Sequence, residues 1–309
     1  MMWGTRPLRT FFGTQLLPRG SCAHWTATLG DYWTLTKPEV NLLIVITALA
    51  GFYLASPATA HWPFVRLLNT LVGTLLVASG TGTLNQYIER DFDGQMRRTS
   101  GRPLPAGRIN PSKALWFGIV LALAGGLYLA LLVNLLASAL AMLTLSTYLL
   151  FYTPLKRKTP LCTLVGAFPG AAPPLIGWAG ARGDLSPEAW ALYAIVFLWQ
   201  FPHFMAIAWM YREDYARAGY LTLPRGERQG HFMTWQLMAF SLALVPISLV
   251  PGLLREAGLM YFLAALVLGL GFLYFAACLA FSKSNATARR LLLASVVYLP
   301  LMFAVMMLP

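Results

Sequence analysis

Residues 66–93 read RLLNTLVGTLLVASGTGTLNQYIERDFD, and this stretch decides the fold. The part from 66 to 88 is a long apolar run, and about 20 such residues suffice for an α-helix to cross a bilayer. Polar side chains follow at every fourth position, at Asn85, Glu89 and Asp93. If the helix continues that far, these side chains stack on one face, because steps of four residues drift by only about 40°. We therefore expect a transmembrane helix that ends in three oxygen ligands on one side.

The composition extends the membrane interpretation to the whole chain. Of the 309 residues, 58% are hydrophobic and only 11% are charged, whereas a soluble domain has about 25% charged residues. The net charge of +12 raises the alternative of a nucleic-acid partner, but the arginines lie between apolar runs and not on a soluble basic face. We therefore expect the lipid bilayer, and no nucleic acid, as the partner of this basic chain.

Apolar runs of spanning length predict nine transmembrane helices and an all-α membrane bundle. The fifth run contains several Gly and Pro residues, which are tolerated where neighbouring helices satisfy the freed backbone groups, so we expect it to bend. The predicted spans are 39–56, 66–88, 114–133, 136–153, 161–180, 188–210, 233–252, 259–281 and 291–308.

The basic residues lie almost entirely on one side of this predicted bundle. Of the 23 Lys and Arg residues, 20 fall in the N-terminal tail and in the loops after even-numbered spans, and only Arg66, Arg182 and Arg255 fall on the other side. Cytoplasmic loops are enriched in Lys and Arg, so the asymmetry predicts a cytoplasmic N-terminus. Eight of the 11 acids share the basic side. We expect the chemistry there, and the lack of ionisable groups at the midplane disfavours a transporter.

We divide the chain into a basic N-terminal tail, residues 1–32, and a membrane domain, residues 33–309. The first thirty residues contain Arg6, Arg9 and Arg19 but no acid, a composition compatible with a transit peptide. We favour a short cytoplasmic tail because the segment is short and the predicted orientation requires a positive N-terminus. This favours a bacterial inner membrane over a mitochondrial one.

The predicted face of Asn85, Glu89 and Asp93 suits a complex of Mg²⁺ with a diphosphate. Mg²⁺ takes oxygen ligands and commonly binds one or two carboxylates together with substrate phosphates. The alternative is a solvated, charge-mixed turn at a helix end, against which the position of Asn85 inside the apolar run argues. Basic residues would neutralise the diphosphate, although each could instead be kept for orientation. The candidates are Lys37, Arg90, Arg97, Lys156, Arg157, Lys158 and Arg212.

A second polar strip runs along the end of the sixth predicted span and continues past it. Gln200, His203, Ile207, Tyr211 and Asp214 recur at helical spacing. If the helix continues through them, an acid at the cytoplasmic end shares a face with a histidine and an amide two to three turns deeper. This arrangement predicts a slot in the bundle with a charged mouth.

These patterns resemble the UbiA superfamily of intramembrane prenyltransferases. That superfamily has nine helices and an NxxxDxxxD motif after the second, which here reads Asn85, Glu89 and Asp93, with Glu at the middle position. A second acidic motif usually follows the sixth helix, and here only Asp214 is in phase. The resemblance implies Mg²⁺ as the cofactor, held by these four residues, which would then also be the catalytic residues.

Further segments resemble the haem O synthase branch of the superfamily, whose members farnesylate haem b. They are WQFPHF at 199–204, REDYARAG at 212–219, TKP at 36–38, RPLP at 102–105 and YTPLKR at 152–157. The resemblance implies that farnesyl diphosphate alkylates the ring A vinyl group of haem b. Water then adds, giving haem o with its hydroxyethylfarnesyl side chain. A haem A synthase or a terminal oxidase is a candidate protein partner.

The resemblance also gives His203 and Gln200 a candidate role in haem binding. Neutral imidazole can ligate haem iron, and the alternative for His203 is a hydrogen bond between helices. Two other functions stay open. One is a UbiA-type enzyme with an aromatic quinone precursor as acceptor, and the other is a non-enzymatic membrane haem carrier.

Overall fold

The structure, a computed structural model, describes residues 21–56, 63–224, 228–255 and 257–307, with side chains from residue 28 onward except that of Arg228. All regular elements in these ranges are helices, which confirms the all-α prediction. They are α1 Ser21–Leu35, α2 Pro38–Ala55, α3 Phe64–Asp93, α4 Pro111–Leu132, α5 Leu135–Thr147, η1 Tyr148–Tyr152, α6 Thr153–Leu155, α7 Cys162–Gly170, α8 Pro173–Arg182, α9 Pro187–Met210, α10 Arg212–Arg217, α11 Arg228–Ile247, α12 Val250–Leu254, α13 Leu259–Ser282 and α14 Asn285–Met307.

Eight helical segments within the described ranges are long and apolar enough to cross a membrane. They coincide with eight of the nine predicted spans. The fifth predicted span is a pair of shorter helices, α7 and α8, separated at Ala171 and Ala172, so the expected bend is present. The total of nine crossings stays a prediction, because neither half of this pair reaches spanning length by itself.

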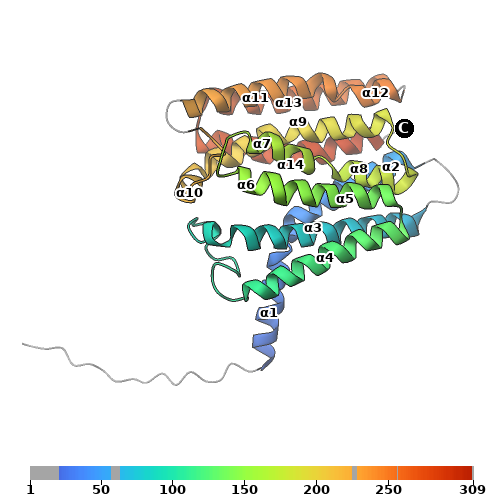
Figure 1. The fold of residues 1–309 in the computed structure, drawn as a ribbon. Coiled ribbons are helices and arrows are strands. Elements are labelled where there is room, and N and C mark those ends of the chain that lie inside the picture. The colour runs from blue at the N-terminus through green and yellow to red at the C-terminus, as the bar shows by residue number, and fades with distance from the viewer. Residues whose placement is uncertain (1–20, 57–62, 225–227, 256, 308–309) are drawn as a thin grey trace, which may run out of the picture.

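The helices lie side by side, and the chain runs back and forth along them (Figure 1). The main packing partners are α3 with α4, α2 with α8, and α11 with both α13 and α9. Figure 1 shows α6, α10 and the segment that follows α3 at one end of the bundle, the end opposite the C-terminus. The topology therefore brings the sequence motifs after α3, α5 and α9 together at this end.

Glycines allow α2 and α8 to pack at backbone contact. A Cβ on Gly51 would lie 2.1 Å from the carbonyl oxygen of Pro174, and a Cβ on Gly177 would lie 1.9 Å from that of Ala48. No side chain fits at either position. Small residues at helix contacts are common in membrane bundles, where close packing stabilises association. The contact holds the second half of the broken pair against α2.

The N-terminal helix α1 projects from the bundle in Figure 1. Its last residue, Leu35, is fully buried and packs with Leu104, Ile109 and Ala114. The helix spans the predicted boundary between residues 32 and 33. The division into tail and membrane domain stays a prediction, and residues 1–20 of the tail lie outside the described residues.

The end of the fourth predicted span is not a regular α-helix. Residues Tyr148–Tyr152 form one π-helical turn, followed by the short α6. A π turn inserts an extra residue and so rotates every following side chain around the helix axis; such turns occur frequently at functional sites. Thr153 and Lys156, which follow this turn, both contact α3.

Candidate functional site

Asn85, Glu89 and Asp93 lie on the last turns of α3, which continues to Asp93 as predicted. Their exposed fractions are only 1%, 5% and 1%. The alternative of a solvated turn is therefore excluded for these three side chains, and their role as metal ligands stays a prediction. A buried carboxylate requires a compensating charge, and each of these side chains has a cationic partner from a different part of the chain.

Lys37 contacts the first of the three residues. Its Nζ donates to Asn85 Oδ1 at 2.6 Å, and Asn85 Nδ2 donates to Thr153 Oγ1 at 3.2 Å. Burial, together with the positive charge of Arg102, lowers the pKa of Lys37 to about 7. An arriving anion would favour the charged form of this amine, so Lys37 is suited to respond to a polyanionic ligand.

Lys156 pairs with the second residue. Its Nζ lies 2.8 Å from Glu89 Oε1, with both side chains mostly buried. The same ammonium lies 4.6 Å from the ring centroid of Tyr152 and 5.8 Å from that of Tyr220. Although burial by itself lowers the pKa of a lysine, the carboxylate of Glu89 holds the pKa of Lys156 well above its usual range. Lys156 is therefore a permanent cation in the site.

Arg102 pairs with the third residue and was not among the predicted phosphate-binding residues. Its Nη1 lies 2.6 Å from Asp93 Oδ2. The loop folds back over the end of α3, where Thr99 Oγ1 donates to Asp93 O at 2.8 Å. The RPLP segment was noted as a motif, but nothing in its sequence distance from Asp93 indicated a direct contact.

Asp214 is placed differently from the prediction. Helix α9 ends at Met210, and after Tyr211 the chain starts a separate helix, α10. The predicted continuous face from Gln200 to Asp214 is therefore wrong. The carboxylate of Asp214 is bonded to Arg217 and also accepts from the backbone N–H of Arg98 at 3.3 Å. Its role as a metal ligand stays a prediction.

The other predicted phosphate-binding residues either contact groups outside the cluster of Asn85, Glu89 and Asp93 or are exposed. Arg212 donates to Trp209 O and Asn285 Oδ1, both at 2.8 Å. Arg90 donates to Tyr87 O at 2.7 Å, and the Arg157 guanidinium lies 4.0 Å from the ring centroid of Phe92. The exposed members of the set are Arg97, Arg157 and Lys158.

His203 occupies a different environment, between α9 and α14. Its Nδ1 lies 2.7 Å from Ser295 Oγ, and that hydroxyl donates its one proton to Leu292 O at 2.6 Å. When the Ser295 proton is directed to Leu292 O, Ser295 accepts from Nδ1–H, and the lone pair of the imidazole is then on Nε2. The indole of Trp199 stacks on the imidazole at 4.8 Å between centroids. This tautomer is the one in which Nε2 can bind a metal ion or accept a proton.

Gln200 is engaged in holding the broken helix pair. Its Nε2 donates to Ala167 O at 3.2 Å and to Val196 O at 3.0 Å, and a Cβ at Gly170 would lie 2.0 Å from its Oε1. Both amide protons are therefore used. Contact of Gln200 with haem stays a prediction, and its visible role is to join α9 to α7.

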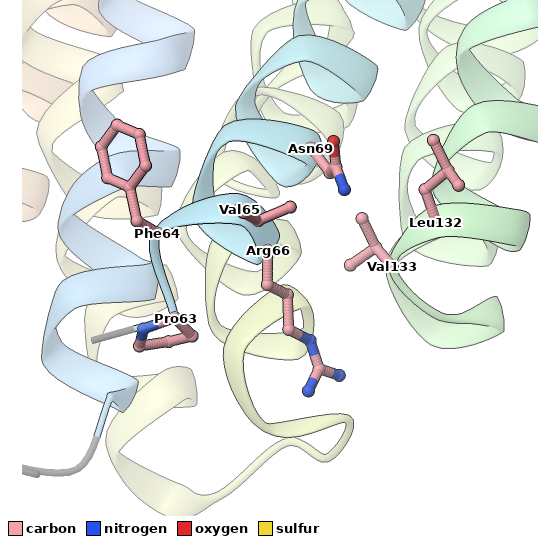
Figure 2. A pocket seen from close by; sticks show the side chains of 7 residues that line it. All are labelled: Pro63, Phe64, Val65, Arg66, Asn69, Leu132 and Val133. Carbon is pink, nitrogen blue, oxygen red and sulfur yellow. The ribbon is translucent and has the colours of Figure 1, made fainter. Parts of the chain in front are cut away.

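Two cavities lie away from the charged cluster. An open hollow at the other end of α3 is lined by Pro63, Phe64, Val65, Arg66, Asn69, Leu132 and Val133 (Figure 2). A narrow apolar crevice between α2, α9 and α14 includes Trp199, the stacking partner of His203. Only the crevice adjoins a predicted site residue.

The residues at the end of α3 fit a divalent cation by the chemistry of their donor set. Two buried carboxylates and an amide oxygen are hard ligands of the kind that Mg²⁺ takes. Each carboxylate uses one oxygen for its ion pair, Glu89 Oε1 and Asp93 Oδ2. Among the described residues no group of three His, Cys, Asp and Glu side chains is suited to hold a metal ion by itself.

The fold and this cluster define a multi-pass membrane protein with buried ion pairs at one end of its helical bundle. The sequence model of the UbiA prenyltransferase family matches residues 44–304. Because this match covers most of the chain, the chain belongs to the UbiA prenyltransferase family, and it is a prenyltransferase by membership.

Several relatives are similar over nearly their whole length. A protoheme IX farnesyltransferase of Solibacter usitatus is 47% identical, with 90% of this chain and 98% of the relative covered. A protein of the same description from Koribacter versatilis is 48% identical, covering 91% and 93%. Another from Salinibacter ruber is 45% identical, covering 90% and 98%.

Solved structures share the fold at low sequence identity. A digeranylgeranylglyceryl phosphate synthase has a TM-score of 0.73 at 18% identity, with 91% of this chain and 98% of that one covered. A UbiA homolog from Archaeoglobus fulgidus, bound to GPP and Mg²⁺, has a TM-score of 0.61 at 15% identity, with 90% and 100% covered. The UbiA fold predicted from the motifs is therefore confirmed.

Proposed function

We propose that this chain converts haem b to haem o by transferring the farnesyl group of farnesyl diphosphate, with addition of water. The observation that carries the proposal is the pair of buried ion pairs at the end of α3, Glu89 with Lys156 and Asp93 with Arg102. The full-length similarity to protoheme IX farnesyltransferases supports haem b as the acceptor. Both organic substrates partition into lipid, whereas diphosphate needs a cationic site at the membrane surface.

The reaction begins at the bond between farnesyl C1 and oxygen. When this bond breaks, both electrons leave with the diphosphate, and the allylic cation bonds to the terminal carbon of the ring A vinyl group. The positive charge then lies on the vinyl carbon next to the ring. A water oxygen bonds to this carbon and loses a proton, which completes the hydroxyethylfarnesyl group.

The residues of the site stabilise the departing diphosphate. Lys156 and Arg102 are held in place before substrate arrives by their ion pairs with Glu89 and Asp93, and preorganised charge is effective because no reorganisation is needed during the reaction. When bound, Mg²⁺ supplies further positive charge to the phosphate oxygens. Lys37 adds a third amine from the start of α2.

His203 is the proposed haem contact. Its Nε2 lone pair is directed by the bond from Nδ1–H to Ser295, and the adjoining crevice between α2, α9 and α14 is apolar. The proposal also includes a cytoplasmic N-terminus and a bacterial inner membrane, where a haem A synthase or terminal oxidase would receive the product.

Mass spectrometry of extracted haems tests the function. Membranes containing the full chain are incubated with haem b, farnesyl diphosphate and Mg²⁺, with EDTA in a parallel sample. We expect a haem heavier by one farnesyl group and one water, absent with EDTA. Unmodified haem despite folded protein would refute the proposal and direct the search to an aromatic acceptor or to a carrier role.

A further inference from the structure

The hydroxyl of Tyr220 is buried and has no hydrogen-bond partner among the described residues. Its side chain is only 7% exposed. A buried hydroxyl without a partner is destabilising, and phenylalanine would fill the same space without this cost. Such a group calls for an explanation, and a ligand that is absent from the structure is the simplest one.

Tyr220 differs from the other buried hydroxyls in its surroundings. Its ring lies 5.8 Å from Lys156 Nζ and 6.4 Å from the ring of Phe92, next to Asp93. The carboxylate of Glu89 is another near neighbour of this phenol. A phenol is protonated at neutral pH, so its hydroxyl can act as a hydrogen-bond donor.

Local structure fixes Tyr220 at this position. Gly219 adopts a φ of +69°, which reverses the chain after α10. The N–H of Tyr220 then donates to Tyr215 O at 2.8 Å, and the N–H of Leu221 donates to Lys156 O at 2.7 Å. The segment after α10 is thus hydrogen-bonded directly to the residue that carries the catalytic cation.

We propose that the Tyr220 hydroxyl donates a hydrogen bond to the diphosphate of the prenyl substrate, beside the ion pair of Glu89 and Lys156. This role rests on the proposed function, because it requires a prenyl diphosphate as the substrate. It adds a neutral donor to a site otherwise made of full charges. A neutral donor strengthens binding of the diphosphate without adding charge that would repel Lys156.

Tyr220→Phe tests this role, because the substitution removes only the hydroxyl. The full chain in detergent is titrated with inorganic diphosphate in the presence of Mg²⁺, and separately with haem b. We expect the dissociation constant for diphosphate to rise about tenfold, with haem b affinity and thermal stability unchanged. The matched control is Tyr298→Phe, since Tyr298 on α14 is also buried and without a partner among the described residues.

The outcomes separate this proposal from the function on which it rests. Equal diphosphate affinity in wild type and Tyr220→Phe overturns the role of Tyr220 alone. Weaker diphosphate binding in the variant supports that role even if no haem o is formed. A wild-type chain that binds no diphosphate with Mg²⁺ overturns both proposals. An equal loss of diphosphate affinity in Tyr298→Phe overturns the role of Tyr220 alone.

Discussion

Lys156→Met is the most informative single substitution in the site. The side chain keeps its length and apolar stem but loses the ammonium that lies 2.8 Å from Glu89. Removing one preorganised group that stabilises developing negative charge costs about 3–4 kcal/mol. At 1.36 kcal/mol for each factor of ten, we expect kcat/KM for farnesyl diphosphate to fall about 10²-fold to 10³-fold, measured as haem o formed by purified enzyme.

The substitution also leaves Glu89 buried without its partner, so stability must be measured beside activity. Breaking a buried ion pair by removing one member costs about 3–5 kcal/mol. The double variant Glu89→Gln with Lys156→Met removes both charges, and we expect it to recover thermal stability but not activity. The matched control is Lys158→Met, the same change of charge at an exposed position two residues further along.

Two results would refute this reasoning about Lys156. One is a loss of activity in Lys156→Met no larger than in Lys158→Met. The other is recovery of activity along with stability in the double variant, which would make Lys156 only a structural partner of Glu89.

Three further predictions concern the rest of the site. Asp93→Asn keeps the shape of a metal ligand but removes its charge, so we expect haem o formation to fall about 10²-fold or more; normal turnover in a product assay would contradict the metal assignment. His203→Ala should lower haem b retention, and Ser295→Ala should weaken it about tenfold because the imidazole loses its orienting acceptor; an unchanged Soret titration in both would remove His203 from the haem site. Arg212→Gln should keep kcat/KM within about twofold, because the guanidinium is bonded to Trp209 and Asn285; a large loss would return Arg212 to the diphosphate site.

The sequence by itself determined the membrane bundle and the face of Asn85, Glu89 and Asp93. Both follow from local periodicity, since a helix of known pitch fixes which residues share a side. The Gly and Pro residues of 161–180 likewise predicted the break between α7 and α8, because these residues interrupt the helical hydrogen bonds locally.

Only the tertiary structure decided which cation meets which residue of this face. The pairs of Glu89 with Lys156 and of Asn85 with Lys37 join residues far apart in sequence, and a π turn sets the phase of Lys156 in a way that 3.6-residue periodicity cannot give. Because α9 ends at Met210 and α10 starts at Arg212, Asp214 does not lie on the helix face of His203, and helical periodicity cannot show this either. Local pattern fixes the face of a helix, whereas the partner of that face depends on how separate helices pack and where each one ends.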